Sequence, residues 1–258
     1  MGLITAGVLV VAARRGRAVL SVRQLVHTAI HAIGYDVKAY QPSSSAVAQW
    51  MRMLAAHSID VVLDVGANVG QFGTGLRSAG YRGLIVSFEP LSSARAKLKA
   101  AAGRDPLWKI AEQAALGASD GEVELNIAGN SASSSVLPML LRHSAAAPES
   151  VYVGSERVPL RRLDDLAPAY VDDRSKTFLK IDTQGYEDKV LEGGLRTLER
   201  AIGLCVELSF VPLYGGQLLY KEMVPRLEAL GFELWNVSPA LIDARDGRLL
   251  QVDGTFFR

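Results

Sequence analysis

The feature that most constrains this chain is a short apolar run that ends in a carboxylate and is followed by a glycine turn. Residues 61–65 read Val-Val-Leu-Asp-Val, and the turn from Gly66 to Gly70 leads into a segment with helical spacing of apolar residues. A strand, a glycine turn and a helix in this order begin a doubly wound α/β sheet, which binds ligands at the carboxyl ends of its strands. We therefore expect an α/β protein with its site at that edge.

A second apolar run, residues 84–88, ends at Glu89 and Pro90. Glu89 follows the glycine turn by about twenty residues, the spacing at which an acid accepts hydrogen bonds from the ribose hydroxyls of a nucleoside. The sequence therefore predicts a nucleoside cofactor, with Glu89 on its ribose and Pro90 beside it. Ala115, near the end of the third expected strand, is predicted to form part of the adenine wall.

The composition of the turn indicates which nucleoside it binds. A dinucleotide-binding loop needs three closely spaced glycines so that its N–H groups can approach a pyrophosphate, whereas this turn has two. A carboxylate at this point repels phosphate and attracts the ammonium and sulfonium groups of S-adenosylmethionine. We therefore predict S-adenosylmethionine, with NAD in a Rossmann oxidoreductase as the alternative. The predicted cofactor-binding residues of the turn are Asp64, Gly66, Asn68, Gly70 and Gln71.

Two later strands are also expected to end in acids, at Asp182 and Glu207. Together with Asp64 and Glu89, these acids predict a cleft along one edge of the sheet. Asp182 is predicted to be the general base or the acid that orients the acceptor, with Glu207 and His143 as further candidates. No metal site is predicted, although a divalent cation beside Asp182 remains open.

A long insertion, residues 129–154, is expected to interrupt the alternating pattern of strands and helices. It begins with the polar run Asn-Ser-Ala-Ser-Ser-Ser at residues 130–135 and becomes apolar in its middle. This composition favours a lid that covers the cofactor and grasps a polyhydroxy acceptor. A flexible surface insertion, with His143 as a surface histidine, is the alternative.

The N-terminal part, residues 1–45, is expected to be a helical extension of the catalytic domain at residues 46–258. Residues 3–13 are almost wholly apolar and precede an arginine-rich stretch, but they are too few to span a bilayer. We expect the extension to pack on the sheet or on a partner in a homodimer. Peripheral membrane contact through its helix, at the inner face of the plasma membrane, is the alternative.

Composition excludes several classes of protein. The formal net charge of +1 gives no electrostatic footprint for nucleic acid, so none is predicted as a partner. The single cysteine, Cys205, excludes a disulfide within the chain and fits a reducing, cytoplasmic compartment.

The motifs together resemble the FkbM-type S-adenosylmethionine-dependent O-methyltransferases. From about residue 60 to 210 the chain carries, in order, D-V-G-A-N-V-G-Q-F, F-E-P, N-S-A-S-S-S, L-K-I-D-T-Q-G-Y-E and V-E-L. The resemblance implies a class I methyltransferase fold: a Rossmann-like sheet of seven strands with an antiparallel last strand and helices on both faces.

The same resemblance implies an activity and an acceptor. Family members methylate hydroxyl groups of sugars or polyketides, and the serine-rich lid most resembles actinobacterial members that act on deoxysugars of cell-envelope glycolipids. The family commonly has Val-Glu where this chain has Thr183 and Gln184, so no role is carried over from that glutamate. A non-catalytic partner subunit with the same fold therefore remains an alternative.

Overall fold

The computed structural model describes residues 22–34 and 45–258, and the chain divides into two compact units, residues 1–45 and 46–258. Within the first unit, α1 spans Val22–Ala32. The apolar segment 3–13 and the arginines after it lie outside the described residues. Among the helices that are described, none has the length and apolar content needed to cross a membrane.

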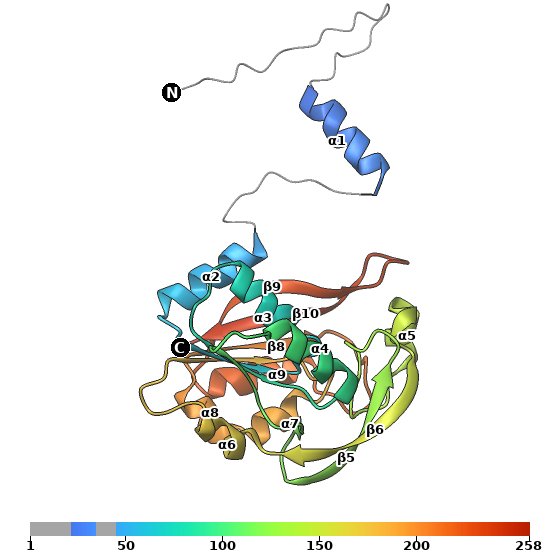
Figure 1. Ribbon diagram of the computed structural model, residues 1–258. Coiled ribbons are helices and arrows are strands. Elements are labelled where there is room, and N and C mark those ends of the chain that lie inside the picture. Colours follow the sequence, from blue (N-terminus) through green and yellow to red (C-terminus); the bar gives the residue numbers. More distant parts are fainter. Residues whose placement is uncertain (1–21, 35–44) are drawn as a thin grey trace, which may run out of the picture. The chain divides into compact units, whose positions relative to one another are not determined.

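The second unit is built around a twisted sheet (Figure 1). In the described part of the chain this sheet has seven strands in the order β3-β2-β1-β7-β8-β10-β9. Parallel pairing joins β1 to β2 and β7, and β7 to β8, whereas β10 is antiparallel to both β8 and β9. The predicted seven-stranded sheet with an antiparallel last strand is confirmed. The strands are β1 (Val61–Val65), β2 (Leu84–Phe88), β3 (Trp108–Ile110), β7 (Thr177–Ile181), β8 (Gly203–Ser209), β9 (Glu233–Ile242) and β10 (Leu249–Phe257).

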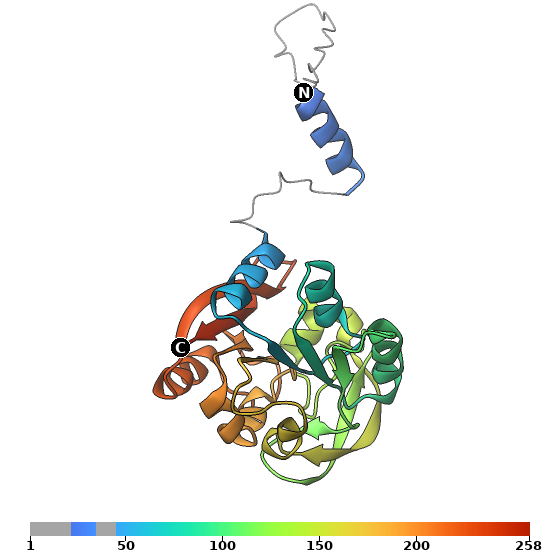
Figure 2. The ribbon, with the colours of Figure 1, turned by 60° about the vertical axis from the view of Figure 1, so that its left-hand side comes forward.

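Helices cover both faces of this sheet, as Figures 1 and 2 show. Successive side chains of a strand point to opposite faces, so Val62 joins one core and Leu63 joins the other. The helices of the first core are α2 (Ala46–Ala56), α3 (Gln71–Ser78) and α4 (Ser92–Ala102). Those of the second are α6 (Leu163–Leu166), α7 (Glu187–Glu192), α8 (Leu195–Arg200) and α9 (Tyr220–Ala229).

A smaller sheet, in the order β4-β6-β5, was not expected from the sequence as a separate layer. It consists of β4 (Ala115–Leu116), β5 (Gly121–Ala128) and β6 (Tyr152–Arg161). The predicted insertion is the connection between β5 and β6, and it contains α5 (Leu141–Ala146) and a 3₁₀ turn at Pro148–Ser150. A further 3₁₀ turn, Ala167–Ala169, follows α6. The insertion therefore begins and ends on a pair of antiparallel strands.

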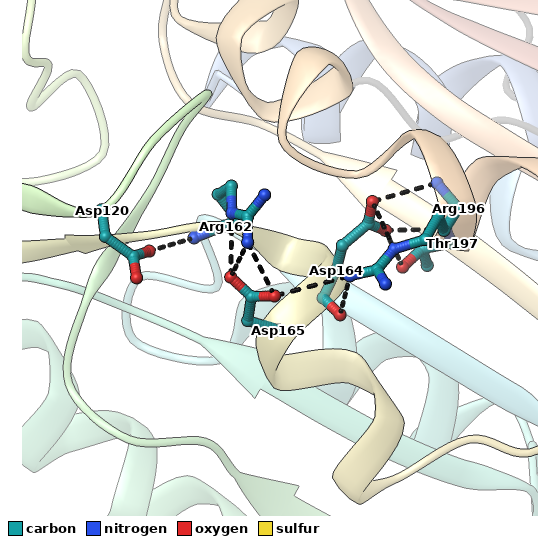
Figure 3. A network of polar contacts seen from close by, with 6 residues as sticks. All are labelled: Asp120, Arg162, Asp164, Asp165, Arg196 and Thr197. Carbon is teal, nitrogen blue, oxygen red and sulfur yellow. Dashed lines mark hydrogen bonds and ion pairs between the residues drawn. The ribbon is translucent and has the colours of Figure 1, made fainter.

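A polar network ties the small sheet to the helices of the second core (Figure 3). The Asp164 carboxylate accepts hydrogen bonds from the N–H groups of Arg196 and Thr197 at 3.0 and 2.8 Å, and so caps the start of α8. Two residues earlier, the Arg162 N–H donates to Asp120 in the turn before β5, at 3.2 Å. The network thus fixes the base of the hairpin that carries the insertion.

Candidate active site

The glycine turn after β1 brings three strand ends into contact. The N–H groups of Gly66 and Ala67 both donate to the carbonyl oxygen of Phe88, at the end of β2, at 3.0 and 3.1 Å. On the other side, a Cβ on Gly66 would lie 1.8 Å from the carbonyl oxygen of Asp182, and Gly66 has a φ of +79°. Because only glycine fits both conditions, this residue sets how closely β1 approaches the end of β7.

A main pocket of about 570 Å³ opens at this edge of the sheet. Its wall combines apolar side chains with a few polar groups from the strand ends and from the insertion. The lining residues are Val65, Gly66, Asn68, Phe88, Glu89, Pro90, Ala114, Ala115, Leu116, Leu125, Ser131, Ala132, Ser134, Val136, Asp182, Thr183 and Tyr186.

A side pocket of about 560 Å³ adjoins the main pocket. It is lined by Gly66, Ala67, Asn68, Gln71, Phe72, Ala132, Lys180 and Asp182. Four of these, Gly66, Asn68, Ala132 and Asp182, line both pockets. The two pockets therefore meet at the glycine turn and the end of β7, where one elongated ligand can occupy both.

Glu89 is held at the wall of the main pocket by the backbone. Its Oε2 accepts from the N–H of Asn68 and its Oε1 from the N–H of Leu91, both at 2.7 Å. The side chain is only 5% exposed, and this burial raises the pKa of Glu89 to about 7. A carboxylate offers about four acceptor positions, so both oxygens retain capacity for ligand hydroxyls.

The first turn of the insertion is bonded to the strand ends. Ser131 Oγ donates to Asn68 Oδ1 at 3.0 Å, and Ser135 Oγ donates to the carbonyl oxygen of Gln184 at 2.7 Å. Ser131 and Ser134 also line the main pocket. The segment predicted to be a lid therefore forms one wall of the pocket and is attached to two strand ends.

Lys180 links Asp64, within β1, to Asp182, which follows β7. Its Nζ lies 2.9 Å from Asp182 Oδ2 and 3.9 Å from Asp64 Oδ1. Burial opposes ionisation of Asp182, but the Lys180 ammonium and the hydrogen bonds to the carboxylate outweigh it, so the pKa of Asp182 lies below its usual range. Burial dominates at Asp64, whose side chain is fully enclosed, and raises its pKa. Asp182 is thus the acid that is ionised and open to the pockets.

Gln184 lies between Asp182 and Glu207. In the sequence this residue is recognisable only as a departure from the family pattern, and it is not among the predicted site residues. Its Nε2 donates to Asp182 Oδ1 at 2.9 Å and to Glu207 Oε2 at 2.8 Å. Burial and the neighbouring carboxylates raise the pKa of Glu207 well above its usual value. Glu207 is 9% exposed and lines neither pocket, and it shares the amide of Gln184 with Asp182 as a hydrogen-bond donor.

The predicted site residues fall into two groups. Gly66, Asn68, Gln71, Glu89, Pro90, Ala115 and Asp182 line the pockets. Asp64, Gly70, Glu207 and His143 line neither. The His143 ring is buried and lies edge-on to Tyr214, with 4.9 Å between ring centroids. Tyr214 is itself fully buried.

The chemistry of the two pockets fits the predicted cofactor. Ala115 and its apolar neighbours form a wall that could contact adenine, and Glu89 beside them could accept hydrogen bonds from ribose hydroxyls. Lys180 and Asp182 give the side pocket one charge of each sign, which suits an α-amino acid. Lys180 faces two carboxylates, so the surroundings of the pocket junction favour a positively charged ligand.

Solved structures of similar fold include two proteins described as S-adenosylmethionine-dependent methyltransferases and a fibrillarin. A protein of Listeria monocytogenes assigned to the S-adenosylmethionine-dependent methyltransferases is 9% identical, with a TM-score of 0.47 over 81% of this chain and 96% of that chain. An S-adenosylmethionine-dependent methyltransferase of Mesorhizobium loti is 12% identical, with a TM-score of 0.46 over 84% and 100%. Fibrillarin of Aeropyrum pernix, with natively bound S-adenosyl-L-methionine, is 12% identical, with a TM-score of 0.43 over 76% and 66%. These similarities concern the fold.

The family is given by the sequence itself. None of the curated proteins matches the chain. The family model of the methyltransferase FkbM domain matches residues 64–234, a range that contains the glycine turn, Glu89, the lid and Asp182. This match decides against the NAD alternative. The chain belongs to the methyltransferase FkbM domain family, and it is a methyltransferase that uses S-adenosylmethionine.

Proposed function

We propose that this enzyme transfers the methyl group to a hydroxyl oxygen of a sugar, namely a deoxysugar of a cell-envelope glycolipid. The observation that carries the proposal is the position of Asp182. Its carboxylate lines both pockets, exposes 32% of its side-chain surface and is bonded by Lys180 and Gln184. An ionised carboxylate at this junction is suited to accept the proton of an attacking hydroxyl group.

Different parts of the donor would be bound by residues of the two pockets. Glu89 would accept hydrogen bonds from the ribose hydroxyls, and Ala115 and Pro90 would contact the adenine. Lys180 would pair with the carboxylate of the amino-acid end. When bound, S-adenosylmethionine supplies a methyl group on a positively charged sulfur, which an oxygen nucleophile can attack.

Asp182 has two tasks in this proposal. It orients the acceptor hydroxyl, so that the oxygen lies in line with the methyl carbon and about 3 Å from it. As the new C–O bond forms, the hydroxyl proton passes to a carboxylate oxygen of Asp182, and from there to water. Glu207 acts on Asp182 through Gln184, and His143, which lines neither pocket, has no contact with the reactants.

Residues 130–135 support an acceptor with several hydroxyl groups. This run of asparagine and serines opens the lid, and two of its serines line the main pocket beside the glycine turn. A polyketide hydroxyl would use the same chemistry and is the alternative acceptor. The net charge of +1 favours neither RNA nor another polyanion, so RNA enters the test as a separate acceptor class.

The test measures methyl transfer and donor binding separately. Purified protein with radiolabelled S-adenosylmethionine is offered envelope glycolipids, polyketides and total RNA, and we expect label in the glycolipid fraction. Asp182→Asn should lower kcat by at least about a hundredfold, because it removes the proton acceptor. In the same variant, the Kd for S-adenosylhomocysteine measured by calorimetry should change by less than about threefold. A tenfold change in Kd corresponds to about 1.4 kcal/mol of binding free energy.

Three outcomes would contradict the proposal. Full activity of Asp182→Asn would show that another group takes the proton. Label in RNA or in a polyketide would show that the acceptor belongs to that class instead. No transfer to any acceptor would indicate a partner subunit that binds the donor without catalysing methyl transfer. In cells, glycolipids from a strain that lacks the protein should have lost one methyl group by mass spectrometry.

The N-terminal unit would serve a lipid-linked acceptor by bringing the enzyme to the inner face of the plasma membrane. Co-sedimentation of the full chain with anionic vesicles tests this role, and light scattering tests whether the extension instead forms a homodimer. Loss of vesicle binding after removal of residues 1–45 would support membrane contact.

A further inference from the structure

Gln184 contacts two acids of the site, Asp182 and Glu207, with a single amide group. Its Nε2 lies 2.9 Å from Asp182 Oδ1 and 2.8 Å from Glu207 Oε2, and the residue is 9% exposed. The two N–H bonds of the amide are therefore both used, one on each carboxyl group. No carboxylate could make these contacts, because an ionised carboxylate has no hydrogen to donate.

The surroundings fix which way the amide points. The Tyr214 hydroxyl donates to Gln184 Oε1 at 2.8 Å, so the oxygen end faces away from the acids and the NH₂ end faces them. The backbone is fixed as well, because Ser135 Oγ donates to the Gln184 carbonyl oxygen at 2.7 Å. Gln184 also has a φ of +57°, a left-handed conformation that persists only where its surroundings hold it.

Two carboxyl groups that lie side by side repel each other when both are ionised, and a positive or hydrogen-bond-donating partner between them relieves this repulsion. A divalent cation such as Mg²⁺ or Mn²⁺ commonly fills this place in proteins, bound by carboxylate and amide oxygens. Here the amide oxygen that could bind a cation is turned toward Tyr214, and the second oxygen of Asp182 is taken by Lys180. Across residues 22–34 and 45–258, no three side chains of the metal-binding types lie close enough to hold an ion.

We propose that Gln184 is a positioning residue whose amide takes the place of a divalent cation between Asp182 and Glu207. It fixes the orientation of the Asp182 carboxylate, so that the enzyme holds this group ready without a metal ion. This inference rests on the proposed function only in that Asp182 is the group facing the acceptor hydroxyl. The place of the amide between the two acids is independent of which acceptor is methylated.

The test exchanges the amide for a carboxylate of the same shape. Gln184→Glu places a third acid between Asp182 and Glu207 and so creates the oxygen ligand set that a divalent cation needs. Gln217→Glu is the matched control. Gln217 lies on the same side of the site, where it accepts from the N–H groups of Leu213 and Tyr214 and donates to Ser209, and no hydrogen bond joins it to Asp182.

Mn²⁺ binding to the full-length protein is followed by electron paramagnetic resonance, without donor or acceptor. Gln184→Glu should bind one Mn²⁺ with a Kd on the order of 10⁻⁴ M. Wild type and Gln217→Glu should show no saturable binding over the same range. Adding Asp182→Asn to Gln184→Glu should abolish the binding, which places the ion at the junction of the two acids.

Thermal unfolding gives a second, independent measure of Mn²⁺ binding to the variant. In EDTA, Gln184→Glu should melt below wild type because like charges are crowded together. Mn²⁺ at about one hundred times its Kd should raise the melting temperature of this variant by about 5–10 °C and leave wild type and Gln217→Glu unchanged.

Either of two results would overturn the inference. The first is saturable Mn²⁺ binding by wild type that disappears in Asp182→Asn, which would show that the natural site uses a cation; this measurement does not depend on whether Gln184→Glu folds. The second is a folded Gln184→Glu that binds no Mn²⁺. Failure of the proposed function would appear elsewhere, as absent methyl transfer by a wild type that behaves as expected toward Mn²⁺.

Discussion

The pKa of Glu89 makes donor binding depend on pH. Burial places this pKa at about 7 in the free protein, so about half of the molecules carry a protonated Glu89 at pH 7. Hydrogen bonds from two ribose hydroxyls favour the ionised carboxylate, because a protonated acid has fewer acceptor positions. Binding of S-adenosylhomocysteine at pH 7 should therefore release about half a proton from Glu89.

The same linkage fixes how affinity changes with pH. Ionised Glu89 falls from about 90% at pH 8 to about 10% at pH 6, so the affinity of wild type should fall about tenfold over this range. Glu89→Gln cannot ionise and should show little of this dependence. At pH 8 the variant should also bind about 10–100-fold more weakly, because a hydrogen bond to a charged group contributes roughly 1.5–3 kcal/mol.

The assay is isothermal titration of S-adenosylhomocysteine into wild type and Glu89→Gln, each in buffers of different ionisation enthalpy. The slope of the observed enthalpy against buffer enthalpy gives the number of protons released. The difference between the two proteins isolates Glu89 from the other acids near the pocket, including Glu187 with its raised pKa of about 7. Equal proton release by both proteins would refute the assignment of Glu89 to the ribose.

Three further substitutions test the framework of the site. Gly66→Ala should lower the melting temperature by about 10 °C, since its Cβ would clash with the carbonyl oxygen of Asp182 at 1.8 Å; an unchanged melt would contradict the turn geometry. Lys180→Met should cost about 3–5 kcal/mol in urea unfolding, because it leaves fully enclosed Asp64 without its ammonium partner. Since burial raises the pKa of Asp64, this cost should shrink as the pH falls and Asp64 takes up a proton; a cost that grows at low pH would exclude this cause. Ser131→Ala should weaken S-adenosylhomocysteine binding about fivefold through loss of one lid hydrogen bond, and an unchanged Kd would separate the lid from donor binding.

Local patterns were enough to locate the strand ends of the sheet. A β-branched run, an acid and a glycine turn lie within a few residues of one another, so residues 61–70 and Glu89 could be interpreted without knowing the fold. The seven-stranded sheet followed from the resemblance of these motifs to the FkbM-type methyltransferases, and not from the local patterns themselves. Glu89 and Asp182 lie at the pocket because the carboxyl ends of β2 and β7 share one edge of the sheet, whereas Ala115 reaches the pocket from β4 of the smaller sheet.

Tertiary structure decided which side chains meet across that edge. Asp64 and Lys180 are far apart in sequence and come together because β1 pairs with β7, which makes Asp64 a partner of Lys180 instead of a wall residue. Gln184 reaches both Asp182 and Glu207 only because β8 lies beside β7. The second sheet and the burial of His143 likewise depend on packing between distant segments. The alternation of apolar and polar residues predicts the face of the sheet to which a side chain points. The residues that this side chain contacts depend on the order of the strands and on the segments that cover the strand ends.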